Sequence, residues 1–80
     1  MKSKQGYKGY VIEARSHELR DGGFSTEFSV EEHHASGMTA TQFYLPGTFQ
    51  SQELAIAAAI CAGQQEIDLG FERGRAVVNG

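Results

Sequence analysis

An amphipathic helix that follows about fifty residues of strand and turn sequence is the feature that most restricts the fold of this chain. The run from Gln52 to Asp68 repeats apolar residues at helical spacing and is rich in alanine, the best helix former. Ser51, directly before it, is a preferred N-cap residue, and Glu53 puts a carboxylate in the first turn, where the helix dipole favours it. This order predicts a small antiparallel sheet closed by one C-terminal helix.

Two glycines are expected to shape this helix. Gly63 lies on its apolar stripe with Ile56 and Ile67, so the missing side chain would allow close approach to the sheet. Glycine costs a helix about 1 kcal/mol relative to alanine, so its presence here indicates a packing reason. Gly70 is the expected C-terminal stop of the helix.

Three segments before the helix show the alternation of polar and apolar residues that is typical of half-buried strands. They span residues 7–15, 24–31 and 39–45. The middle segment is the clearest. Its residues on the side of Phe28 are mostly apolar, whereas those on the side of Glu27 are all polar or charged. We therefore expect one face of the sheet to be in the core and the other in water.

Glycine, proline and polar residues are expected to connect these strands. Asp21-Gly22-Gly23 is a strong turn signal, and the polar residues 32–37 predict a second hairpin loop. Pro46-Gly47 indicates a turn or a bulge after the third strand.

The whole chain of 80 residues is the length of one small domain. Residues 1–5 are polar and are expected to fray, and residues 71–80 are expected to form a loose tail. The prediction is a single α+β domain over residues 1–80 with an ordered core at about 7–70.

Composition argues against several classes of protein. With 40% apolar and 21% charged residues the chain resembles globular rather than disordered proteins. A net charge of -3 is unfavourable for binding nucleic acid, which usually requires a basic surface. The longest apolar run, residues 54–62, is too short to span a membrane, and the first residues do not have the pattern of a signal peptide. We expect a cytoplasmic protein without membrane contact.

Candidate chemistry rests on His17, His33, His34 and Cys61. His33 and His34 are adjacent and would face opposite sides of a strand, whereas in a loop they could bind a metal with His17 or Glu32. Cys61 falls in the middle of the helix, where half-buried packing is expected. Catalytic motifs such as Gly-x-Ser-x-Gly and His-Glu-x-x-His are absent from the sequence. We predict that the protein is not an enzyme and has no catalytic, cofactor or metal residues.

Tyr7, Glu27 and Tyr44 form the predicted interaction surface. Tyr7 and Tyr44 fall outside the clearest inward-facing positions, and exposed aromatic residues are enriched in protein interfaces. The alternative is that these aromatic residues cover a second small core or the edge of the sheet. The free edges of such a sheet also favour a partner strand or self-association, so the expected partner is another protein or a second copy of the chain.

The sequence resembles a group of short bacterial proteins that includes the HlyU-like family. The shared positions are Tyr7–Ile12, the Asp21–Phe24 turn, Phe28–Glu31, the Phe43 strand, Phe49-x-Ser51-x-Glu53-x-Ala55 and Gln65-x-Ile67-Asp68. The likeness covers roughly residues 7 to 71 and departs from the family pattern at residues 32–37 and 45–47. For the HlyU-like family it implies transcriptional activation, and for similar prophage-associated proteins an accessory or assembly role.

The leading hypothesis is a non-enzymatic protein-interaction or accessory module of bacterial or phage origin. One alternative is a transcription-linked regulator that touches nucleic acid through its basic ends, namely Lys2, Lys4, Lys8, Arg73 and Arg75. A second alternative is a small enzyme or metal-binding protein that uses the histidines or Cys61.

Overall fold

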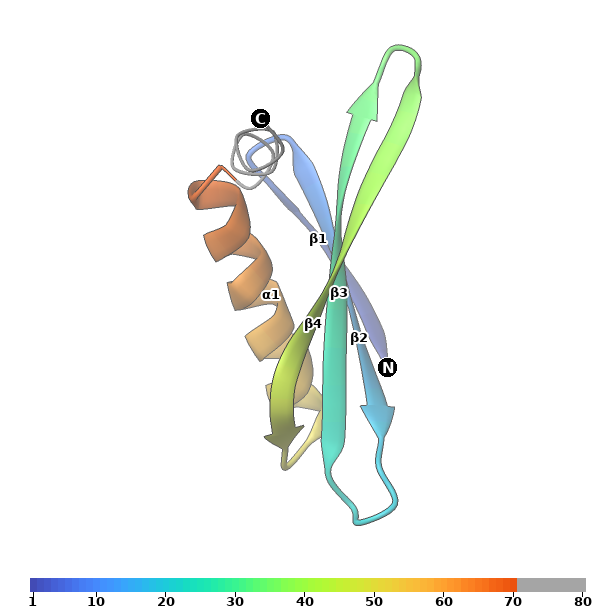
Figure 1. The fold of residues 1–80 in the computed structure, drawn as a ribbon, viewed down its shortest axis with the longest axis vertical. Helices are drawn as coiled ribbons and strands as arrows, with labels where there is room; N and C mark the ends of the chain where they lie inside the picture. The colour runs from blue at the N-terminus through green and yellow to red at the C-terminus, as the bar shows by residue number, and fades with distance from the viewer. Residues whose placement is uncertain (71–80) are drawn as a thin grey trace.

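The computed structural model describes residues 1–70, which form a four-stranded antiparallel sheet with one helix on one of its faces (Figure 1). The strands lie side by side in chain order, and α1 follows the last of them. The elements are β1 (Lys2–Tyr7), β2 (Tyr10–Glu18), β3 (Phe24–His34), β4 (Gly37–Phe49) and α1 (Gln52–Asp68). The predicted α+β fold is therefore confirmed. The predicted tail, residues 71–80, lies outside the described residues.

β1 corrects the prediction that residues 1–5 fray. It pairs with β2 along its whole length, and the last residue pair before the turn is Tyr7 opposite Tyr10. The turn between them consists of Lys8 and Gly9, with φ angles of 50° and 86°. Positive φ at both central residues is what a two-residue type I′ hairpin turn requires. β1 lacks an alternating apolar pattern, since only Ser3 and Tyr7 within it are partly buried, and its backbone pairing with β2 places it in the sheet.

The β3–β4 hairpin is longer than predicted. Residues 32–34 continue β3 instead of forming a loop, and only Ala35 and Ser36 remain in the turn. The loop between β2 and β3 matches its turn signal, since Gly22 has a φ of 91° and the Asp21 carboxylate accepts a hydrogen bond from the Gly23 N–H at 3.1 Å.

β4 continues through Pro46-Gly47 but pairs irregularly there. Thr26 lies opposite Leu45, whereas Phe24 lies opposite Phe49, so a short piece of β3 faces a longer piece of β4. Such an excess of residues on one strand is a bulge, one of the two outcomes that the sequence left open.

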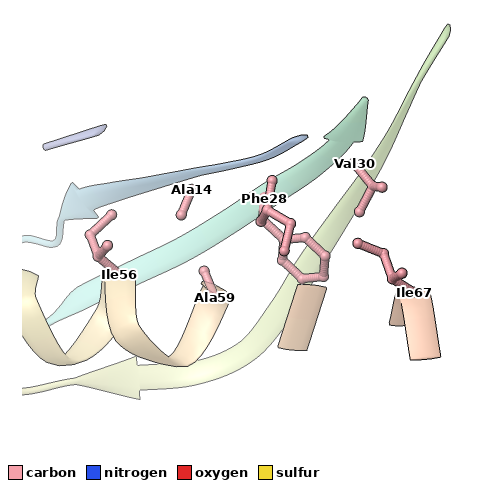
Figure 2. Close-up of a cluster of buried hydrophobic side chains, with 7 residues drawn as sticks. Ala14, Phe28, Val30, Ile56, Ala59 and Ile67 are labelled. Atoms are coloured by element: carbon pink, nitrogen blue, oxygen red, sulfur yellow. The ribbon is translucent and has the colours of Figure 1, made fainter. Parts of the chain in front are cut away.

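The core lies between α1 and the face of the sheet that carries Phe28 (Figure 2). Phe28 is 2% exposed and stacks on Phe43 of β4 with ring centroids 4.9 Å apart. The buried apolar side chains of this cluster are Ile12, Ala14, Phe28 and Val30 from the sheet and Ile56, Ala59 and Ile67 from the helix. The strand alternation thus placed the inward-facing residues correctly.

Both ends of α1 agree with their sequence signals. The Ser51 hydroxyl accepts a hydrogen bond from the Leu54 N–H at 3.1 Å, as an N-cap does. At the other end Gly70 has a φ of 73° and donates its N–H to the Ile67 carbonyl at 3.0 Å. No helix within residues 1–70 is long and apolar enough to cross a membrane.

Candidate interaction surface

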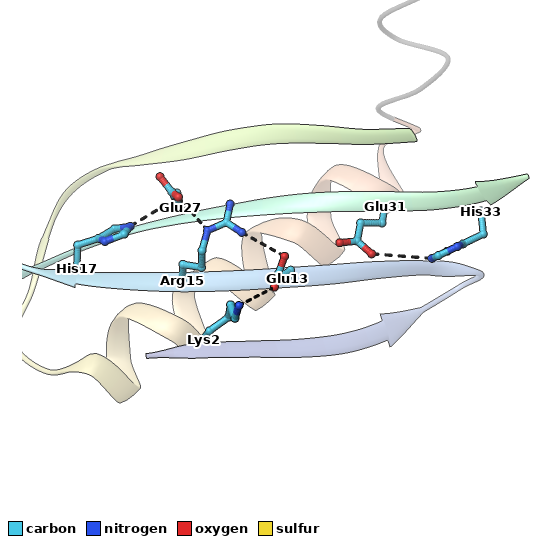
Figure 3. A network of polar contacts seen from close by, with 7 residues as sticks. All are labelled: Lys2, Glu13, Arg15, His17, Glu27, Glu31 and His33. Carbon is cyan, nitrogen blue, oxygen red and sulfur yellow. Dashed lines mark hydrogen bonds and ion pairs between the residues drawn. The ribbon is translucent and has the colours of Figure 1, made fainter. Parts of the chain in front are cut away.

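The face of the sheet opposite α1, which we call the open face, carries a row of charged side chains, and no helix within residues 1–70 lies over it (Figure 3). Strand alternation sends the odd-numbered residues 13–17 of β2 and 27–33 of β3 to this side. The charged or titratable members drawn in Figure 3 are Lys2, Glu13, Arg15, His17, Glu27, Glu31 and His33. The open face is thus a polar surface built on the rigid backbone of the sheet.

Arg15 is the centre of this polar row. Its Nε donates to Glu27 Oε2 at 2.9 Å and its Nη1 donates to Glu13 Oε1 at 3.2 Å. Glu13 also lies 3.7 Å from the Lys2 ammonium, and His17 Nε2 lies 3.6 Å from Glu27 Oε2. These contacts connect β1, β2 and β3, so alternating charges are matched across three strands.

The electrostatics of the row favour an ionised Glu27. The hydrogen bond from Arg15 holds the pKa of the Glu27 carboxyl below its usual range, and the charges of Arg15 and His17 act in the same direction. Partial burial of the carboxyl opposes this effect but does not outweigh it. The charged pair is therefore a fixed feature of the surface near neutral pH.

The open face is less exposed to water than the sequence predicts. Ser29 and Glu31 are only 5% and 9% exposed, although they lie on the face opposite α1, the helix of the described part of the chain. Both lie on β3, an inner strand of the sheet, where side chains from β2 and β4 flank them on either side. Neighbouring strands thus supply burial that a pattern in one strand does not reveal. Glu31 also lies 3.9 Å from His33 Nε2.

Tyr44 is the large aromatic residue at the margin of the open face. It lies on β4 directly opposite Glu27 and is 73% exposed. Met38, on the same strand and also on the open face, is 53% exposed. The structure therefore brings two of the three predicted interaction residues, Glu27 and Tyr44, into one cross-strand pair.

Tyr7 lies apart from that pair, on the face that packs against α1. Its hydroxyl donates to the Asp68 carboxylate, with both oxygens at 3.0 Å, and the Lys8 ammonium donates to Asp68 Oδ1 at 2.6 Å. The hydrogen bond from Lys8, followed by that from Tyr7, lowers the pKa of Asp68, while Asp68 raises the pKa of Lys8. Tyr7 thus follows the alternative in which it covers the sheet edge, and it connects the β1–β2 turn to the end of the helix.

The four residues considered for metal or nucleophilic chemistry are scattered. His33 and His34 both lie on β3 and therefore point to opposite faces, and His17 lies at the far end of the neighbouring strand. Within residues 1–70, no group of three or more His, Cys, Asp or Glu side chains is arranged to hold a metal ion. Cys61 is exposed, which corrects the prediction that it is half-buried.

Cys61 lines an open groove of about 450 Å³ between β1 and α1. The lining also includes Met1, Gln5, Ile56, Ile60 and Gln64. None of the three histidines lines this groove, so the structure does not pair the thiol with an imidazole base there.

The basic residues proposed for nucleic-acid contact are also divided. Lys2 faces Glu13 on the open face, and Lys8 is bound to Asp68 at the opposite end of β1. Arg73 and Arg75 lie outside the described residues. Comparison of the chain with protein-family models, with curated proteins and with solved structures found no match.

Proposed function

We propose that this protein is a non-enzymatic interaction module that binds a protein partner through the open face and the adjoining strand β4. The observation that carries this proposal is the position of Tyr44, a 73% exposed aromatic residue beside the Glu27–Arg15 ion pair. A rigid aromatic anchor next to fixed, matched charges is a common composition of protein interfaces. For this module we also propose a cytoplasmic accessory or assembly role, which is what the sequence resemblance implies.

The backbone beneath this surface favours binding without reorganisation. Glu27 and Arg15 lie on adjacent strands in a continuous register, and their side chains are mutually hydrogen-bonded at 2.9 Å. A surface that is already ordered loses little conformational entropy when it binds. The Tyr44 side chain has only two main torsions, so it too is ordered at low cost.

Capture of partners by the tagged protein, from nuclease-treated and untreated lysate of its host, tests this proposal. Tyr44→Ser removes the aromatic anchor, and Leu54→Ser is the matched control because Leu54 is an exposed apolar residue on the helix. We expect a protein that survives nuclease treatment, is retained by the parent and the Leu54→Ser variant, and is lost with Tyr44→Ser.

Two results would contradict the proposal. If Tyr44→Ser retains every partner of the parent, the open face is not the binding surface. If the partners disappear only when nuclease is added, the transcription-linked alternative replaces the interaction module.

A further inference from the structure

We propose that β4 pairs with β4 of a second copy of this chain, so that two four-stranded sheets join into one continuous antiparallel sheet. This inference rests on the proposed function, because it names the partner that the edge of the interaction surface accepts. It depends on a difference between the two outer strands, β1 and β4. Within residues 1–70, no further strand pairs with the outer edge of either one.

The two edges differ in charge. β1 carries Lys2 and Lys4 on its open-face side, and both are exposed. β4 has no charged residue from Gly37 to Phe49, and Met38–Ala40 at its beginning are all exposed. Proteins commonly protect an exposed edge from strand addition with lysine, whereas a long uncharged edge is a template for pairing. β1 therefore has the composition of a protected edge, and β4 that of a pairing edge.

The stretch of β4 that is suited to pairing is limited at one end by the bulge. The irregular register begins after Leu45, where Pro46 has no N–H to donate. Residues 38–45 are left as a regular and uncharged segment with three β-favouring residues, Thr39, Thr41 and Phe43, on the helix side. This is a usual length for a strand in a sheet.

The segment is also complementary to itself. Two copies related by a two-fold axis bring the same residues together in reverse order, so a charged strand would meet its own charges. A β4–β4 pair brings no charges together, whereas a β1–β1 pair would bring the lysines of both copies together. In a continuous sheet the open faces of both copies are on one side. The axis then passes near Thr41 or Gln42, and Tyr44 of each copy lies near Met38 or Ala40 of the other.

The arrangement of residues 1–70 leaves this edge accessible. In Figure 1 the β3–β4 hairpin extends past the end of α1 and past the β1–β2 turn. The exposed beginning of β4 lies in that extension. A second strand could therefore approach the edge without meeting the helix of the first copy.

Substitution of Gln42, an exposed residue at the centre of the segment, tests the inference. Gln42→Lys places two like charges near the axis, and Gln65→Lys makes the same change at an exposed position on α1 as the control. Analytical ultracentrifugation over a range of concentrations should show a dimer for the full-length parent and for Gln65→Lys. We expect dimerisation at least about tenfold weaker for Gln42→Lys, with an unchanged circular dichroism spectrum.

A charge-complementation experiment separates pairing from a general defect. Gln42→Glu alone should also weaken the dimer, whereas an equimolar mixture of Gln42→Lys and Gln42→Glu should associate again, because opposite charges then meet at the axis. Restored association would support β4 pairing. A parent that is monomeric at every concentration, a dimer that Gln42→Lys leaves intact, or a mixture that does not associate would overturn it.

The two proposals fail in distinguishable ways. A monomeric parent that still captures a partner through Tyr44 would overturn β4 pairing and keep the interaction module. If the protein forms a β4 dimer but captures no other protein, β4 pairing is supported and the proposal of a different protein partner is contradicted.

Discussion

Gly63 shows how a single residue sets the distance between the helix and the sheet. A Cβ atom added at this position would lie 2.8 Å from Ile12 Cγ2 and 3.0 Å from Ile12 Cδ1. Ile12 is completely buried on β2, and its branched side chain has little freedom to rotate. The predicted close approach of Gly63 to the sheet is therefore confirmed, and it explains why a poor helix former lies within α1.

Gly63→Ala should destabilise the fold even though alanine favours a helix. The helical gain of about 1 kcal/mol is outweighed by overpacking against Ile12, which typically costs about 1 to 3 kcal/mol. We expect a net loss of up to about 2 kcal/mol in the free energy of unfolding, measured with urea. Ala57→Gly, at an exposed helix position, reports the helix preference alone. A Gly63→Ala variant more stable than the parent would contradict the packing role.

The β1–β2 hairpin shows that an element can be specified by its turn rather than by its strand pattern. Lys8 and Gly9 have positive φ, and the two tyrosines that flank them face each other across the turn. An aromatic residue on each side of a residue–glycine pair was the signal in the sequence that could have revealed this hairpin. The contact of Tyr7 with Asp68, 61 residues further along, then holds the hairpin against the helix.

Two glycines near this turn should respond differently to alanine. Gly9 has a φ of 86°, so Gly9→Ala should cost about 1 to 2 kcal/mol of stability. Gly6 lies in the strand, and an added Cβ would meet the Tyr10 carbonyl at an ordinary 3.8 Å. Gly6→Ala should therefore be neutral or stabilise by up to about 1 kcal/mol. Equal unfolding midpoints for the two variants would show that the turn is not under this constraint.

The two faces of the sheet carry two kinds of stabilisation. Its helix side buries the apolar cluster around Phe28, whereas its open side carries the ion pairs around Arg15. The apolar side supplies most of the stability, because burial of apolar area is the dominant favourable term in folding. The charged side adds a contribution that depends on pH.

Glu27→Gln should reduce stability near neutral pH by up to about 1 kcal/mol, as loss of a cross-strand charge pair does. The lowered pKa of Glu27 means that its contribution is complete above the usual glutamate value of about 4.3 and is lost as the pH falls towards the folded-state pKa. The difference between the parent and Glu27→Gln should therefore shrink in urea titrations below about pH 4.

Glu18→Gln is the control for this pH dependence. Glu18 is an exposed residue at the end of β2 and forms no ion pair with residues 1–70 that would be lost on substitution. The free energy of unfolding of the Glu18→Gln variant should equal that of the parent at every pH. A Glu27→Gln deficit that stays constant from pH 7 to pH 3 would mean that the charge of Glu27 contributes nothing.

Much of the interaction surface could not be predicted from the sequence. The outward position of Glu27 and Tyr44 followed from alternation along their strands, and their exposure differs because Glu27 is on an inner strand and Tyr44 on an outer one. The contacts of Arg15 with Glu13 and Glu27 depend on cross-strand register. The partner of Tyr7 depends on where the helix ends relative to the first hairpin.

The helix, its N-cap at Ser51, its stop signal at Gly70 and the inward-facing residues of the central strands could all be predicted, because each depends on local chemistry or on a short repeat. Three properties followed from the fold instead: polar β1 joins the sheet, Glu31 is buried on the face opposite α1, and uncharged β4 is an edge strand. These properties depend on which strands become neighbours, and backbone pairing between neighbours leaves little trace in the side chains of either strand.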